Sequence, residues 1–210
     1  MYTVNPIHLP SYSGRELLLH HFSAGSDRLA VCFPGMSYPC EMPLLYYAGH
    51  AARQQQYDLL MLEYGYQAAR TPFDPNDIPR IIEECLQGIL RVAESYPKIV
   101  FISKSFGTYI AGETARKMAS NFPQLEINHL YLTPLHSAVP QMLTSRGTVI
   151  WGTNDQAIDA EEVKQIRSNP SLELHAIEGA DHALELPDLH DTMQTLAQIV
   201  RIYTEYFEKV

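Results

Sequence analysis

The chain has no excess of positive charge. Its 210 residues include 15 Lys and Arg against 24 Asp and Glu, so the formal net charge is -9 with neutral histidines. Proteins that bind nucleic acids need clustered basic side chains to displace counterions from phosphates. The one segment that groups arginines, 70–80, carries as many acidic as basic residues. The sequence therefore predicts no nucleic-acid partner.

Long apolar runs are also missing. No stretch of the chain approaches the roughly 20 apolar residues that a membrane-spanning helix requires. Residues 1–22 lack the basic segment followed by an apolar segment that marks a secretory signal. We therefore expect a cytoplasmic protein with no membrane partner.

Cysteines are few, and glycine-rich phosphate-binding patterns do not occur. Cys32, Cys40 and Cys85 are odd in number and have no CxxC spacing, which disfavours both disulfides and a zinc site. They fit buried free thiols in a reducing compartment. Neither GxGxxG nor GxxxxGK[ST] follows an apolar run, which disfavours a nucleotide-binding protein. We expect no metal and no cofactor.

What the chain does have is a regular alternation of strand-like and helix-like segments. Its apolar content of 46% can build one sizeable core, and at this length we expect a single domain spanning 1–210. The predicted strands are 15–22, 27–35, 57–66, 98–103, 127–135, 147–152 and 172–177. The predicted helices are 41–55, 76–97, 106–120, 159–169 and a C-terminal helix with the apolar stripe Met193, Leu196, Val200, Tyr203 and Phe207. This alternation is typical of an α/β fold, with a mostly parallel central sheet and helices on both faces.

Unusual polar residues follow four of the predicted strands. In open parallel sheets, ligands bind beyond the carboxyl ends of the strands. Those ends carry, in chain order, "PGMSYP", "SKSFG", "GTNDQ" and "EGADHAL", which supply a glycine turn, a serine, an aspartate and a histidine. A serine hydroxyl is a weak nucleophile at neutral pH, so it needs an adjacent base, and the base needs a third group to fix its tautomer. The pattern therefore predicts a serine nucleophile, a histidine base and an aspartate that orients the histidine.

Two serines compete for the role of nucleophile. In "SKSFG", Ser105 has small residues two positions away on both sides, Ser103 and Gly107. A tight strand-to-helix turn, the nucleophile elbow, requires small residues at these two places. The alternative is that both serines merely cap the following helix. We predict Ser105 as the nucleophile and Ser103 as a spacer.

An acid and a base follow later strands. We predict Asp155 as the acid, with Asp159 as a competitor that is better placed to cap the next helix. His182 is predicted as the base because it lies after a strand and before the last helix. Its neighbour Asp181 should point elsewhere, since adjacent side chains in a loop diverge. His136 is predicted as a pocket or helix-start residue.

These residues resemble those of the α/β-hydrolase superfamily. "SKSFG", "WGTNDQ" and "EGADHAL" occur in the chain order Ser, Asp, His that is typical of the family, and the resemblance covers nearly the whole chain. It implies an eight-stranded, mostly parallel sheet, of which this chain lacks the first strand. It also implies an elbow serine after the fifth strand, an acid after the seventh and a histidine after the eighth.

The resemblance further implies an oxyanion hole made by two backbone N–H groups, those of Met36 and Phe106. Such donors stabilise a tetrahedral oxyanion, typically by about 3 to 4 kcal/mol each. The chain departs from the family at Ser103, where glycine is commoner, and at Pro34, where histidine is frequent. Only the short segment 136–146 separates the sixth and seventh strands, where many relatives insert a lid, so we expect an open site.

The expected function is that of a serine hydrolase, by default a carboxylesterase that cleaves small or medium acyl substrates through an acyl-enzyme. Hydrolysis of thioesters or amides is an alternative, and so is a non-catalytic binding protein that has kept the fold. Tyr38, Tyr64 and His136 are predicted to contact the substrate. Phe33 and Tyr66 also lie near strand ends, and a core or rim position is the alternative for each of the four aromatic residues Phe33, Tyr38, Tyr64 and Tyr66.

Overall fold

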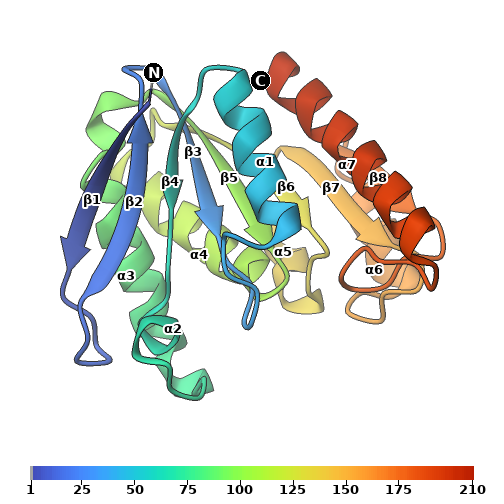
Figure 1. The fold of residues 1–210 in the computed structure, drawn as a ribbon, viewed down its shortest axis with the longest axis horizontal. Coiled ribbons are helices and arrows are strands. Elements are labelled where there is room, and N and C mark those ends of the chain that lie inside the picture. The colour runs from blue at the N-terminus through green and yellow to red at the C-terminus, as the bar shows by residue number, and fades with distance from the viewer. Residues whose placement is uncertain (1) are drawn as a thin grey trace.

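One eight-stranded sheet lies at the centre of the computed structural model, which describes residues 2–210 (Figure 1). Its strands are β1 Thr3–Leu9, β2 Leu17–Ser23, β3 Arg28–Phe33, β4 Asp58–Met61, β5 Lys98–Lys104, β6 Glu126–Leu132, β7 Gly147–Gly152 and β8 Leu172–Ile177. The spatial order is β1-β2-β4-β3-β5-β6-β7-β8. The pairs β1–β2 and β2–β4 are antiparallel, and all other neighbours are parallel. The predicted α/β class with a mostly parallel sheet is confirmed.

Helices cover both faces of this sheet. In Figure 1, α1 Pro43–Gln54 and α7 Leu189–Lys209 lie in front of the sheet, and α3 Ile78–Leu90, α4 Phe106–Asn121 and α6 Ala160–Arg167 lie behind it. Two short helices, α2 Gly65–Ala69 and α5 Val139–Met142, follow β4 and β6. Short 3-10 turns occur at η1 Pro75–Asp77, η2 Ala93–Ser95 and η3 His136–Ala138. The expected coverage of both faces is therefore present.

The alternation of side chains along β3 shows how one strand serves both faces. Leu29, Val31 and Phe33 are buried in the apolar cluster that includes α3 and α4. Ala30 and Cys32 are buried in the cluster that includes α1 and α7. Because successive side chains of a strand point to opposite faces, a continuous apolar run is what a strand buried on both sides needs.

The first strand is a correction to the sequence analysis. β1 exists and pairs with β2 along its whole length, from Thr3 opposite Ser23 to Leu9 opposite Leu17. Most of its residues are exposed, so the strand carries no run of apolar side chains to reveal it. Pro6 also lowers its strand propensity, although an edge strand tolerates proline. Pairing with β2 therefore makes this segment a strand.

Two predicted elements differ from the structure, one in its bounds and one in its buried face. The run 57–66 is a strand only over β4, because Gly65 begins the short helix α2. In the C-terminal helix, Met193 is not part of the buried stripe and is 56% exposed. The buried face of α7 is formed by Thr195, Ile199, Ile202, Tyr203, Tyr206 and Phe207. The helical spacing of apolar residues therefore placed the buried face about one residue away from where it lies at the start of α7.

A buried carboxylate joins the elements at the amino end of β4. Asp58 accepts hydrogen bonds from the Ala24 N–H, the Ser23 hydroxyl and the Tyr96 hydroxyl, each at 2.7 Å. Burial raises the pKa of Asp58, but these hydrogen bonds outweigh burial and hold the pKa below its ordinary value. The network is structural, since Asp58 lies at the end of the sheet opposite to the carboxyl ends of the parallel strands.

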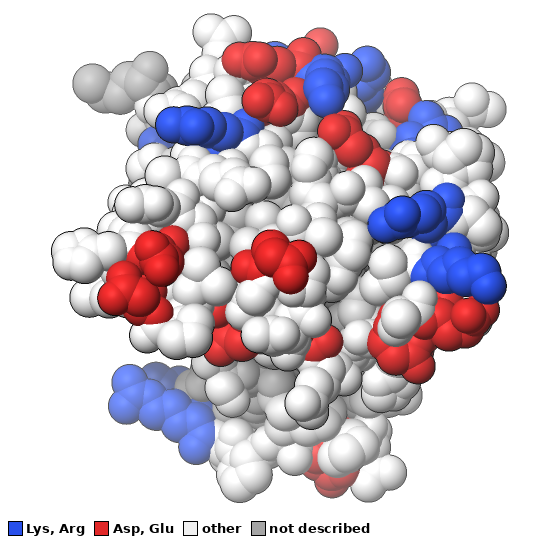
Figure 2. Space-filling view, turned by 90° about the vertical axis from the view of Figure 1, so that its right-hand side faces the viewer, with Lys and Arg blue, Asp and Glu red and all other residues white. Residues whose placement is uncertain are grey.

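The surface mixes charges of both signs. On the side that carries α7, Lys and Arg side chains lie among Asp and Glu side chains (Figure 2). Within residues 2–210, no helix combines the length and the apolar character needed to cross a membrane.

Candidate active site

The turn from β5 to α4 holds Ser105 in an unusual backbone conformation. Its φ is +54° and its ψ is -120°, a region that non-glycine residues seldom adopt. The Ser105 N–H donates to the Leu132 carbonyl at 3.0 Å, and the Ser105 carbonyl accepts from the Thr108 N–H at 2.8 Å. The Thr108 hydroxyl donates to the same carbonyl at 2.6 Å. These contacts fix the sharp turn from which the Ser105 side chain projects.

The residues that flank Ser105 must be small, as predicted. A Cβ added at Gly107 would lie 2.5 Å from the carbonyl oxygens of Phe33 and Pro34, which are backbone atoms and cannot move aside cheaply. Ser103 is fully buried in β5, and its hydroxyl has no hydrogen-bond partner within the described chain. Ser103 therefore lies away from any reaction partner and fills the place of a small residue.

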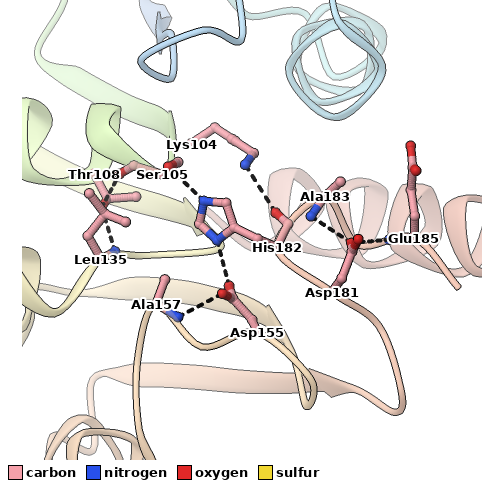
Figure 3. A network of polar contacts seen from close by, with 10 residues as sticks. All are labelled: Lys104, Ser105, Thr108, Leu135, Asp155, Ala157, Asp181, His182, Ala183 and Glu185. Atoms are coloured by element: carbon pink, nitrogen blue, oxygen red, sulfur yellow. Dashed lines mark hydrogen bonds and ion pairs between the residues drawn. The ribbon is translucent and has the colours of Figure 1, made fainter.

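His182 connects the other two predicted groups (Figure 3). Its Nε2 lies 2.8 Å from Ser105 Oγ, and its Nδ1 lies 2.8 Å from Asp155 Oδ2. The three residues follow β5, β7 and β8, so they meet at the carboxyl edge of the sheet. With Nδ1 donating to the carboxylate, Nε2 is free to accept the hydroxyl proton.

Asp155 is placed to remain ionised. Its side chain is only 1% exposed, and its second oxygen, Oδ1, accepts from the Ala157 N–H at 2.9 Å. Burial raises the pKa of Asp155, but the hydrogen bonds from His182 and Ala157 outweigh it, so the pKa lies below its ordinary value. A buried carboxylate of this kind orients the imidazole and stabilises it when it becomes charged.

The competing acids are engaged elsewhere. Asp159 caps α6, accepting from the Glu162 N–H at 2.8 Å, as the sequence indicated. Asp181 Oδ1 accepts from the N–H groups of Ala183 and Glu185 at 2.8 and 3.0 Å. Asp181 therefore shapes the loop that carries His182 without contacting its ring.

The loop after β3, residues 34–38, is held by three side chains from the 64–67 segment. The Tyr64 hydroxyl donates to the Pro34 carbonyl at 2.9 Å, Gln67 Nε2 to the Gly35 carbonyl at 2.9 Å, and the Tyr66 hydroxyl to the Met36 carbonyl at 2.8 Å. Three consecutive carbonyls thus point toward α2. Sequence reasoning did not find this arrangement, because residues 64–66 read as the end of the strand 57–66.

The two N–H groups predicted to form an oxyanion hole are those of Met36 and Phe106. Phe106 is the first residue of α4, so its N–H has no acceptor within the helix. In the described part of the chain, no protein acceptor takes a backbone hydrogen bond from either N–H. Both donors are therefore available to a ligand.

The structure places the three residues that were predicted to contact the substrate in different surroundings. Tyr64 is fully buried and bonded to Pro34, so the expectation that it touches a substrate is wrong. Tyr38 is half-buried, and its hydroxyl accepts from the Leu44 N–H at 2.9 Å at the start of α1. His136 is exposed at the start of η3, and its N–H donates to the Ala157 carbonyl at 3.0 Å. Their contact with substrate stays a prediction.

Phe33 and Tyr66 are buried, at 0% and 6% exposure, so they are core residues, which was the alternative to a substrate contact. As to metals, residues 2–210 hold no group of three or more His, Cys, Asp and Glu side chains arranged to bind an ion.

Lys104 is a neighbour of the site that the sequence analysis missed. It precedes Ser105, is only 4% exposed, and its Nζ donates to the His182 carbonyl at 3.1 Å (Figure 3). Burial lowers its pKa to about 8, although the charges of Asp155 and Asp181 act in the opposite direction. Lysine is rarely buried, so the occurrence of one directly after the predicted apolar strand 98–103 and beside Ser105 was the available signal.

Solved structures share this architecture over almost their full lengths. A predicted CIB-like hydrolase from Thermoplasma acidophilum is 16% identical, with a TM-score of 0.71 and 100% of both chains covered. An esterase from Pyrococcus furiosus is 11% identical, with a TM-score of 0.71 and coverage of 99% of this chain and 93% of that one. A dienelactone hydrolase from Anabaena variabilis is 14% identical, with a TM-score of 0.71 and coverage of 99% and 98%.

The chain has the α/β-hydrolase fold. No protein-family model and no curated protein sequence matches it. Within the α/β-hydrolase fold, Ser105 follows the fifth strand, Asp155 the seventh and His182 the eighth. These are the strand ends at which the resemblance placed a nucleophile, an acid and a base.

Proposed function

We propose that the protein is a serine hydrolase that cleaves small or medium acyl substrates, with carboxylic esters as the expected class. The observation that carries this proposal is the position of His182, whose two ring nitrogens lie 2.8 Å from Ser105 Oγ and 2.8 Å from Asp155 Oδ2. A binding protein that had lost catalysis would have no chemical need for this complete arrangement.

The reaction proposed has two halves. Ser105 Oγ attacks the acyl carbon while His182 Nε2 takes the hydroxyl proton and Asp155 stabilises the resulting imidazolium. The N–H groups of Met36 and Phe106 stabilise the oxyanion. His182 then gives its proton to the departing alcohol, leaving an acyl-enzyme. Water, activated by the same histidine, releases the acid and restores Ser105.

Esters are favoured over amides because an alkoxide leaves more readily than a deprotonated amine, whose nitrogen must receive a proton before the C–N bond breaks, so an ester needs less help from the acid. The P. furiosus structure is described as an esterase and the A. variabilis structure as a dienelactone hydrolase, which also cleaves an ester bond within a ring. These descriptions support the class of bond that we propose here.

A fluorophosphonate probe tests the proposal directly. Wild-type protein should be labelled stoichiometrically, Ser105→Ala should not be labelled, and Ser103→Ala should be labelled like wild type. The serine pair is a matched control, because Ser103 lies only two residues before Ser105, at the end of β5, and only the Ser105 hydroxyl contacts His182. Folded wild type that takes no label would contradict the proposal.

A chain-length series of p-nitrophenyl esters, run beside a thioester and an anilide of the best acyl group, then identifies the bond and the acyl size. Turnover of the thioester or anilide with no turnover of any ester would replace the ester assignment by the corresponding alternative.

A further inference from the structure

Lys104 is the only buried lysine among the five of the chain, all of which lie in the described range. Burying an ammonium group is costly unless other groups compensate. Within the described chain, Lys104 forms no ion pair of 4.0 Å or less with a carboxylate. An ordinary structural salt bridge therefore does not explain why a lysine is placed here.

The Lys104 side chain runs between two loops. Its Cδ would lie 3.5 Å from a Cβ added at Gly35, so it passes across the loop that carries the Met36 N–H. Its Nζ lies 5.0 Å from the centre of the Tyr38 ring, within the range of a cation–π contact. Its hydrogen bond to the His182 carbonyl reaches the other loop (Figure 3).

That hydrogen bond is the only one that the His182 backbone makes with protein groups in the described residues. The residues around it are held by other contacts, since the Asn154 N–H donates to the Ala180 carbonyl at 2.9 Å and Asp181 accepts from two N–H groups of its own loop. Lys104 therefore supplies the direct backbone anchor at the histidine itself, and it does so from the residue next to the nucleophile.

We propose that Lys104 is a positioning residue, whose ammonium ties the loop of His182 to the Ser105 turn and to the 34–38 loop and so keeps the imidazole within reach of Ser105. This inference rests on the proposed hydrolase function. A charge-assisted hydrogen bond is roughly twice as strong as a neutral one, which gives a cation an advantage over a neutral donor at this position.

The charge on Lys104 should depend on pH in the assay range, because its pKa is lowered to about 8. The groups that face it are Asp155 from the loop after β7, Asp181 and His182 from the loop after β8, and Tyr38 from the 34–38 loop. Below that pH the ammonium form holds the carbonyl of His182. Above it a neutral amine remains, and the anchor weakens.

The test uses Lys104→Met, which keeps most of the length of the side chain and removes its charge. Because a buried cation is removed, the variant should unfold at a temperature no lower than wild type. At pH 7 its kcat on the best p-nitrophenyl ester should fall by about 10- to 100-fold, the scale expected for a misplaced catalytic group. KM should change little, since a positioning residue acts through His182 and not on the substrate.

The decisive readout is the ratio of wild-type to Lys104→Met kcat, measured from about pH 6 to about pH 9.5. The ratio should shrink above pH 8, as wild type loses the charge that the variant lacks at every pH. A ratio that stays constant indicates a packing role and would overturn the proposal, and so would an unchanged kcat at pH 7. Lys104→Gln replaces the methionine variant under the same criteria if that variant does not fold. Lys98→Met, at the exposed opposite end of β5, is the matched control and should follow wild type at every pH.

Amide hydrogen exchange separates this inference from the proposed function. Residues 180–186 should exchange faster in Lys104→Met than in wild type at pH 7, and the difference should shrink above pH 8, whether or not the protein is labelled by a fluorophosphonate. Unlabelled wild type with this exchange pattern would refute the hydrolase and leave the anchor standing. Labelled wild type with identical exchange in both proteins would refute the anchor alone.

Discussion

Tyr64→Phe distinguishes a residue that touches substrate from one that shapes the 34–38 loop, which carries the N–H of Met36 that we propose as an oxyanion donor. The substitution removes one hydroxyl, which donates to the Pro34 carbonyl at 2.9 Å in a fully buried setting. No other protein donor reaches that carbonyl in the described structure, so the variant leaves a buried acceptor unpaired. The Gly35 and Met36 carbonyls keep their partners, and the loop should shift without unfolding.

The magnitude follows from the cost of an unpaired buried acceptor, about 1 to 3 kcal/mol in the free energy of unfolding. For a chain of this size each kcal/mol lowers the melting temperature by about 2 to 4 °C, so the expected decrease is about 2 to 12 °C. Loss of a whole oxyanion donor lowers kcat by about 10²- to 10³-fold, and a displaced donor should cost less, about 10-fold. KM should stay near its wild-type value.

Thermal unfolding and ester hydrolysis measure both effects. Tyr57→Phe is the matched control, because the Tyr57 hydroxyl donates to the Val210 carbonyl at 2.6 Å, at the carboxyl end of the chain and away from the site. It should lose stability but not kcat. A Tyr64→Phe variant with raised KM and unchanged kcat would refute the reasoning and restore the view that Tyr64 contacts the substrate.

Three further substitutions test other parts of the structure. Asp155→Asn should lower kcat on p-nitrophenyl acetate by about 10⁴-fold through the wrong histidine tautomer, whereas Asp181→Asn should cost less than about 10-fold; similar losses in both would contradict the assignment of the acid. Gly107→Ala should lower the free energy of unfolding by about 1 to 3 kcal/mol in a urea titration, because its Cβ meets backbone, while Gly49→Ala in α1, whose Cβ would lie 3.0 Å from the end of the Leu59 side chain, should stay within about 1 kcal/mol of wild type. Asp58→Asn should cost about 2 to 3 kcal/mol at pH 7. Because the folded-state pKa of Asp58 is depressed, this difference should shrink as pH falls below about 4, and a pH-independent difference would argue against an ionised Asp58.

The parts of the site that sequence could predict are those encoded locally. The elbow is a short pattern in which an apolar strand, two small residues and a helix follow one another, and the structure places Ser105 and Ser103 as that pattern indicates. Asp155 and His182 could be found because parallel strands deliver their carboxyl ends to one edge, so distant residues become neighbours once the strand order is known.

The remainder depends on contacts between segments. β1 is a strand through its pairing with β2, and its own residues carry little β-signal. The role of Tyr64 depends on where α2 meets the 34–38 loop, which no periodicity specifies. Lys104 was overlooked for a related reason, since the acceptor of its ammonium is the backbone of a residue far away in sequence.

The segment between β6 and β7 has a consequence for what can react at Ser105. Residues 133–146 form only η3 and the four-residue helix α5, and the His182 side chain is 38% exposed. Because no lid covers that side, an acyl group formed on Ser105 as we propose would be open to solvent there, and any small alcohol or amine in solution would compete with water for it. The balance between acid and transferred acyl product would then follow the composition of the medium, so that added methanol should divert turnover into methyl ester.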